Sequence, residues 1–60
     1  MSLDVDIKEA VKSLVFAAGL AIHVTQADIA GAARDLSKKY RDTSARQIEA
    51  EIARHLRNRG

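Results

Sequence analysis

The sequence contains no cysteine and no proline, and it has only three glycines. Without cysteine the chain has no disulfide bonds and no thiolate metal sites, which fits a reducing compartment. Proline and glycine are the residues that most disfavour a helix, whereas alanine, leucine, glutamate, lysine and arginine favour it and dominate here. Because the β-branched residues do not alternate with polar ones, the composition predicts an all-α protein.

Long apolar stretches are also scarce. The longest uninterrupted apolar run, from Leu14 to Ile22, is shorter than the roughly 20 residues that a membrane-spanning helix needs. The chain begins with Asp4 and Asp6 rather than with the basic residues of a secretory signal. We therefore expect a soluble, cytoplasmic protein that does not interact with a membrane.

A chain of 60 residues has room for a single helical domain, here residues 1–60. A domain of this size buries only about 60% of the surface that its unfolded form exposes, so its stability is marginal. Because disulfides are excluded, the remaining sources of stability are close helix packing and association with another chain.

Apolar residues recur at helical spacing in three segments of the chain. They predict a compact three-helix bundle with helices at about 4–18, 25–40 and 44–58 and an extended apolar connector at 20–24. Gly19 is expected to end the first helix in a left-handed conformation. The expected core draws on all of these segments and comprises Ile7, Val11, Leu14, Val15, Leu20, Ile22, Ile29, Leu36, Tyr40, Ile48, Ile52 and Leu56.

Each expected helix starts near a residue pair with the spacing of a capping box, in which two side chains satisfy unpaired backbone N–H groups. These pairs support the helix starts independently of the apolar spacing. They are Asp6 with Glu9, Thr25 with Asp28, and Ser44 with Gln47.

Residues that could carry catalysis or bind a metal show no recognisable grouping. The serines lack a histidine and carboxylate arrangement, and the isolated glycines form no phosphate-binding loop. Zinc needs three or four protein ligands, and His23 and His55 have no carboxylates at a suitable spacing. His23 is expected to be partly buried by the connector, and His55 to pair with Glu51 or to cap its helix. We expect no enzyme activity, cofactor, metal site or small-molecule substrate.

Phe16, the only phenylalanine, does not fit the apolar stripe of the first helix. At about 100° per residue it points almost opposite Ile7, on the side that also carries Glu9 and Lys12. Two interpretations are open: the connector folds back and covers the ring, or Phe16 belongs to a surface for self-association. The candidate interface comprises Val5, Phe16, Leu20 and Ile22.

The charge is unevenly distributed, although the formal net charge is only +2. Residues 1–33 carry two basic against four acidic side chains, whereas residues 34–60 carry eight against four. On the third helix small residues lie among arginines, as in a helix that enters the major groove of DNA. The alternative is a solvated surface on which the arginines pair with Glu49 and Glu51. The candidate nucleic-acid contacts are Arg46, Arg54 and Arg57.

The segment from Thr25 to Ala33, TQADIAGAA, resembles the positioning helix of helix-turn-helix proteins. In that pattern Gln-x-x-Ile-Ala precedes a tight turn and a recognition helix, and the resemblance implies duplex DNA binding. The chain departs from the pattern after Ala33, because no small residue provides a tight turn near Asp35. An alternative alignment places the turn before Ser44, where it has an extra residue.

Three classes of function remain. The favoured class is a helical protein–protein interaction module that self-associates as a homodimer or docks to a larger partner. The alternative is a duplex DNA-binding, helix-turn-helix-like domain that uses the basic face of its third helix, as a dimer. The third is a structural part of a larger protein.

Overall fold

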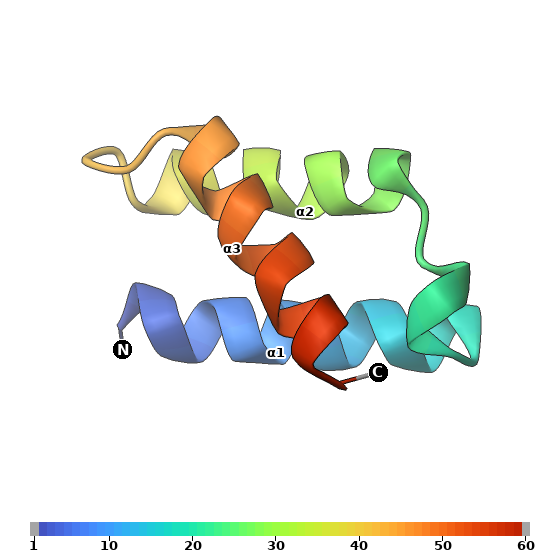
Figure 1. Cartoon of the computed structure of the whole chain (residues 1–60). Helices are drawn as coiled ribbons and strands as arrows, with labels where there is room; N and C mark the ends of the chain where they lie inside the picture. The colour runs from blue at the N-terminus through green and yellow to red at the C-terminus, as the bar shows by residue number, and fades with distance from the viewer. Residues whose placement is uncertain (1, 60) are drawn as a thin grey trace.

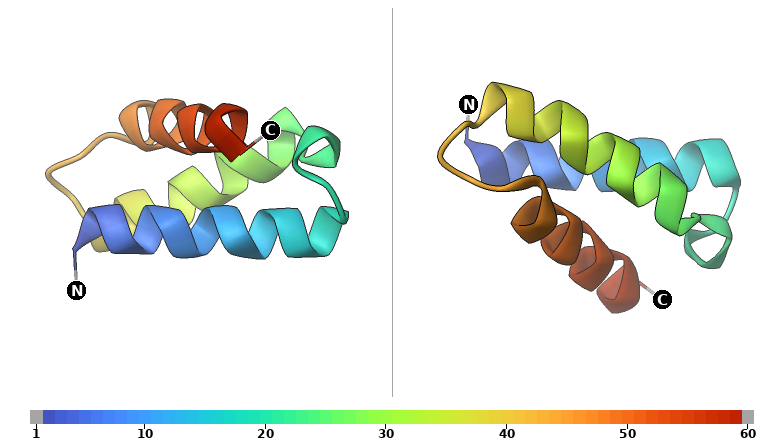
Figure 2. Two further views of the ribbon diagram at one scale, coloured as in Figure 1. Left: turned by 60° about the horizontal axis from the view of Figure 1, so that its bottom comes forward. Right: turned by 90° about the horizontal axis from the view of Figure 1, so that it is seen from above.

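Three α-helices make up most of the protein in its computed structural model, which describes residues 2–59 (Figure 1). They are α1 (Leu3–Ala18), α2 (Gln26–Lys39) and α3 (Ala45–Arg59), with a short 3-10 helix, η1 (Ala21–His23), between α1 and α2. The chain returns along α2 in the direction opposite to α1, and α3 crosses and packs against both (Figures 1 and 2). The predicted three-helix bundle is confirmed, with each end of each helix within one residue of the prediction.

Capping side chains hold the starts of α2 and α3 as the sequence predicts. The Thr25 hydroxyl accepts a hydrogen bond from the Asp28 N–H at 3.1 Å, and the Asp28 carboxylate accepts one from the Thr25 N–H at 3.2 Å. The Ser44 hydroxyl likewise accepts from the Gln47 N–H at 3.2 Å, and the Gln47 side chain accepts from the Ser44 N–H at 3.4 Å. Each pair satisfies backbone donors that a helix start leaves unpaired.

The start of α1 differs from the prediction. The helix begins at Leu3, and its cap is Ser2, whose hydroxyl accepts a hydrogen bond from the Val5 N–H at 3.3 Å. Asp6 lies inside the helix and is only 9% exposed, because its carboxylate is engaged by α2. The predicted capping box of Asp6 with Glu9 is therefore wrong.

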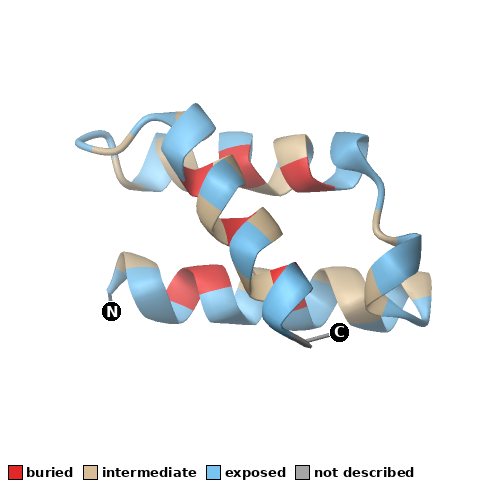
Figure 3. Ribbon diagram, in the orientation of Figure 1, coloured by how far each residue is buried: buried red, intermediate tan, exposed pale blue. Residues whose placement is uncertain are grey.

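The core lies where the three helices face one another (Figure 3). Ile48 and Ile52 of α3 are completely buried and are the largest side chains at its centre. Four residues of the predicted core, Leu14, Val15, Leu36 and Tyr40, are only partly buried. Ala33, which helical spacing places on the buried stripe of the second helix with Ile29, is completely buried, as expected. The buried apolar residues are Ile7, Val11, Ile29, Ala33, Ile48, Ile52 and Leu56.

The connector between α1 and α2 turns tightly instead of running extended. Gly19 ends α1 with a φ of 90°, as predicted, and the chain then forms η1. A 3-10 helix has about three residues per turn, so Ala21 and Val24 share one side, and both pack against the core. Ile22 is directed outward and is 82% exposed.

Three expectations for this connector are therefore wrong. Leu20 is 56% exposed and Ile22 still more so; neither belongs to the core. His23 is exposed instead of partly buried. For Ile22 and His23 the physical reason is the three-residue period of η1, which turns these two consecutive side chains away from the core. Leu20 precedes η1 in extended backbone. None of the described helices is both long enough and apolar enough to span a bilayer.

Candidate interaction surfaces

The Phe16 ring is the most exposed large apolar side chain among the described residues, with 89% of its surface accessible. It lies near the end of α1, on the side turned away from Ile7 and Val11, which pack in the core. The connector does not fold over it, so the interpretation in which Phe16 is covered by its own chain is wrong. The self-association surface stays a prediction.

Val5, Glu9, Lys12 and Phe16 form a single row along α1, which we call the outer face. They are separated by four, three and four residues, so they lie roughly opposite Ile7 on a helix with about 100° per residue. Val5 is 47% exposed, and both charged residues are exposed. Among the described side chains, those of residues 2–58, neither Glu9 nor Lys12 takes part in a salt bridge. The outer face thus presents an apolar residue at each end and an unpaired acid and base between them.

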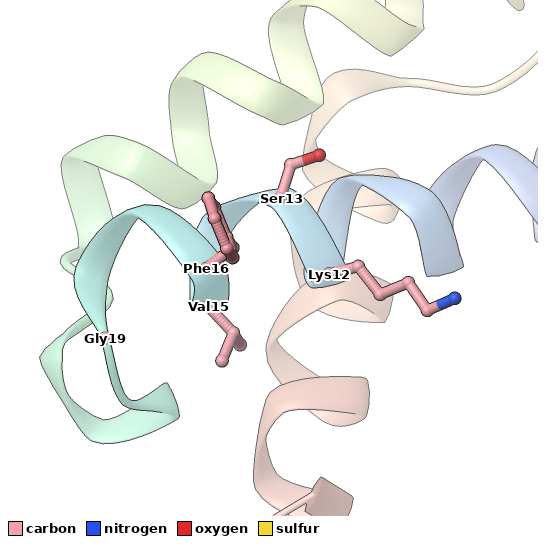
Figure 4. Close-up of a pocket in the computed structure, with 5 residues that line it drawn as sticks. All are labelled: Lys12, Ser13, Val15, Phe16 and Gly19. Atoms are coloured by element: carbon pink, nitrogen blue, oxygen red, sulfur yellow. The ribbon is translucent and has the colours of Figure 1, made fainter.

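A hollow lies beside the Phe16 ring (Figure 4). It is an open depression of about 560 Å³, lined by Lys12, Ser13, Val15, Phe16 and Gly19. Figure 4 shows Ser13 and Val15 pointing to opposite sides of α1, and Lys12 extending toward the N-terminal half of the helix. Gly19 has no side chain to close the far end, and a Cβ built there would meet no atom within 4 Å. The hollow is therefore open to a side chain from outside.

The four candidate interface residues do not share one depression. Val5 and Phe16 share the outer face, whereas Ile22 lines a separate groove of about 360 Å³ between η1, α2 and α3. That groove also includes Leu56 and Arg57, and it shares no lining residue with the hollow beside Phe16. Leu20, about half exposed, lines neither depression.

The predicted nucleic-acid contacts lie on the solvent side of α3. Arg46, Arg54 and Arg57 are all exposed, and so is the small residue Ala50. Arg54 is not an unpaired charge, because its guanidinium lies 2.6 Å from the carboxylate of Glu51. This hydrogen bond lowers the pKa of Glu51 and raises that of Arg54.

Of the two pairs proposed for these arginines, Arg54 with Glu51 is confirmed. Glu49 instead accepts a hydrogen bond from the side chain of Gln26, and no salt bridge to Arg46 forms in the described part of the chain. Two of the three candidate arginines, Arg46 and Arg57, are exposed and form no salt bridge with another described side chain.

The helix-turn-helix resemblance has little structural support. α2 continues without interruption through Asp35 to Lys39, so no turn follows the segment that resembles a positioning helix. The chain turns only at residues 40–44, before α3. A turn of about three or four residues is usual in this motif, so the link between α2 and α3 is longer than the motif requires.

Sequence reasoning missed a polar cluster that joins the start of α1 to the end of α2. The Tyr40 hydroxyl donates a hydrogen bond to the Asp6 carboxylate, and the Lys39 ammonium lies 3.0 Å from the same carboxylate. Both contacts hold the pKa of Asp6 below its usual value, and the pKa values of Tyr40 and Lys39 are raised in turn. No local spacing could have indicated this cluster, because it depends on α2 returning alongside α1.

The position of His55 also differs from the one expected from the sequence. Its Nε2 atom is buried and has no hydrogen-bond partner within residues 2–59, and the ring lines a hollow with Lys8, Val11 and Lys12 of α1. Among the described side chains the expected pair with Glu51 does not form, and Glu51 instead pairs with Arg54. The packing of α3 across α1 accounts for the position of His55.

Comparison with protein-family models, with curated proteins and with solved structures gives no match to this chain.

Proposed function

We propose that this protein is a small helical interaction module that self-associates as a homodimer through the outer face of α1. The observation that supports this proposal is the exposure of Phe16, whose ring is 89% accessible in the protomer. Large aromatic side chains contribute strongly to interfaces, because burying one removes about 150–250 Å² of surface from water. An apolar residue left open on a small domain commonly marks a contact with another macromolecule.

The size of the protomer favours association for a second reason. The molecule measures 30 × 21 × 17 Å, and its completely buried large side chains are Ile48 and Ile52. A domain this small gains little stability from its own core. α1 is about 24 Å long at about 1.5 Å per residue, so a contact along its outer face would extend over most of the molecule.

The test is the solution mass by sedimentation equilibrium over a dilution series. The wild type should approach twice the protomer mass of 6.5 kDa at high concentration and dissociate on dilution. Phe16→Ala should remain monomeric. Ile22→Ala is the matched control, since it also removes a large exposed apolar side chain but from the separate groove, and it should dimerise like the wild type. A wild type that is monomeric at every concentration would contradict the proposal.

A second candidate function is duplex DNA binding through α3. It is favoured by the exposure of Arg46 and Arg57, which flank Ala50 in the sequence. A small residue such as Ala50 leaves room for α3 to approach the base edges in the major groove. Its weakness is the pairing of Arg54 with Glu51, which neutralises part of the positive field. This function predicts binding to nonspecific duplex DNA that weakens steeply between low and moderate salt.

Two triple variants test this second candidate. Replacement of Arg46, Arg54 and Arg57 by glutamine should abolish DNA binding and leave the solution mass unchanged. Replacement of Arg34, Lys38 and Arg41, which lie outside α3, removes the same charge from α2 and the following turn. If both triple variants lose DNA binding equally, α3 has no special role in it. If the wild type does not bind duplex DNA even at low salt, the DNA-binding function is excluded.

A further inference from the structure

We infer that the dimer pairs its two α1 helices antiparallel, with Val5 of each protomer inserted beside Phe16 of the other and Glu9 of each opposite Lys12 of the other. This inference rests on the proposed self-association and specifies its geometry. It follows from the spacing of the outer face, the residues that line the hollow beside Phe16 and the order of the charges along α1.

The spacing of the outer face is that of a coiled-coil seam. Val5, Glu9, Lys12 and Phe16 follow one another at intervals of four, three and four residues, which is the alternation of the two inward positions of a heptad repeat. The two inward positions of a heptad are called a and d. When two such helices pair antiparallel, each a position of one helix lies opposite a d position of the other. With Val5 opposite Phe16, this rule places Glu9 opposite Lys12 without any further adjustment.

The residues that line the hollow beside Phe16 have the spacing that this packing requires. In a coiled coil, each inward side chain enters a hole formed by four residues of the facing helix. Neighbouring turns of one helix supply such a hole at positions i, i+3, i+4 and i+7, and Lys12, Val15, Phe16 and Gly19 have this spacing. These four residues line the observed hollow together with Ser13 (Figure 4). In the inferred dimer, the side chain of Val5 from a second copy enters this hollow as the knob, against the Phe16 ring.

The charges select the antiparallel direction. A parallel pair in register would place Glu9 against Glu9 and Lys12 against Lys12, so two like-charge contacts would oppose association. The antiparallel pair replaces them with two Glu9–Lys12 contacts related by the two-fold axis. Since both side chains are exposed and neither forms a salt bridge within the described part of the protomer, they can reach a second copy. Polar residues within a seam lower its stability but fix its register.

The rest of the described protomer, residues 2–59, leaves this face open. Ile7 and Val11 bind α1 to the core from the opposite side, and α2 and α3 both lie on that side. The left view of Figure 2 shows α1 along one edge of the molecule, with α2 and α3 on the same side of it. A second α1 can therefore approach along the outer face.

Charge exchange tests the register. Glu9→Lys and Lys12→Glu, made singly, each turn both central contacts of the antiparallel pair into like-charge contacts, and each should weaken the dimer by about tenfold in Kd. The double variant, which carries both substitutions, exchanges acid and base in every contact and should return Kd to within about threefold of the wild type. Asp35→Lys and Lys38→Glu make the same charge changes on α2, away from the outer face, and should leave Kd unchanged.

The outcomes separate this geometry from the proposed function itself. A parallel dimer would not be weakened by Glu9→Lys, because the substitution only exchanges a repulsion between two glutamates for a repulsion between two lysines. Single variants that dimerise like the wild type, or a double variant that remains as weak as the single ones, would overturn the antiparallel register. In that case the dimer proposal still stands if Phe16→Ala is monomeric. A monomeric wild type would end both proposals. Circular dichroism of each variant shows whether the protomer remains folded.

Discussion

Phe16→Ala should separate the stability of the protomer from the stability of the dimer. An enclosed phenylalanine buries about 150–250 Å². At an exposed fraction of 89%, only about 20 Å² of that surface contacts the protein's own chain. At about 25 cal/mol per Å² the protomer loses about 0.5 kcal/mol, and the higher helix propensity of alanine offsets a similar amount. We therefore expect the free energy of unfolding of the isolated protomer to change by less than about 0.5 kcal/mol.

The same substitution should have a much larger effect on association. A two-fold dimer contains two Phe16 rings, and burial of about 100 Å² on each would contribute about 5 kcal/mol as an upper estimate. Because about 1.4 kcal/mol corresponds to a factor of ten, Kd should rise by about a thousandfold or more. The dimer of Phe16→Ala should then be undetectable at any practical concentration.

Thermal unfolding followed by circular dichroism measures both effects together. Association stabilises the folded state by mass action, so Tm of the wild type should rise as the protein concentration increases from micromolar to millimolar. Tm of Phe16→Ala should not change with concentration, and the two proteins should have the same Tm at the dilute end. A loss of about 2 kcal/mol or more in the dilute variant would refute the reasoning, because it would mean that the ring is packed on its own chain.

Three further predictions concern the stability of the protomer. Ile52→Ala leaves a cavity at a completely buried position and should lower the free energy of unfolding by about 2–5 kcal/mol. This loss is large enough to abolish the cooperative thermal transition in circular dichroism. A sharp transition near the wild-type Tm would argue against it. Thr25→Ala removes the side-chain cap of α2 and should lower the free energy of unfolding, measured in urea, by about 1 kcal/mol. Thr25→Ser keeps a hydroxyl at the cap and should be close to the wild type in stability. Hydrogen bonding to Tyr40 and Lys39 lowers the pKa of Asp6 in the folded state. The ionised Asp6 therefore stabilises the fold fully above its usual pKa near 3.8, and this stabilisation is lost as the pH falls through the lower pKa of the folded state. Asp6→Asn should therefore be less stable than wild type at neutral pH, with the difference shrinking in acid; an equal gap at all pH values would exclude this linkage.

The fold could be predicted because its determinants are local. The apolar residues recur at helical spacing, and the caps of α2 and α3 lie within three residues of their partners. Gly19 marks the end of α1 because its φ of 90° is one that other residues rarely adopt. Such signals depend on neighbours in sequence, so they can be read without knowing how the helices pack.

The features that the sequence could not provide depend on packing between distant segments. Asp6 has the spacing of a capping residue, but α2 brings Tyr40 to its carboxylate, and Ser2 caps the helix instead. The exposed position of Phe16 could be predicted from its angle relative to Ile7. Whether the connector covered the ring depended on the conformation of η1, whose period of three could not be read from four apolar residues.

Salt should affect the affinities of the two candidate functions differently, because each relies on charge to a different extent. The proposed dimer contains two contacts between Glu9 and Lys12 that lie within the seam and are partly shielded from solvent, so salt should weaken them only modestly. Its apolar contacts, Val5 against Phe16, do not depend on screening, so the dimer should persist at moderate salt. Binding of duplex DNA by Arg46 and Arg57 would instead release counterions and fall steeply over the same range. A dimer that survives a salt concentration at which DNA is released would show that the two associations rest on different interactions, apolar contact in the dimer and phosphate contact in the DNA complex.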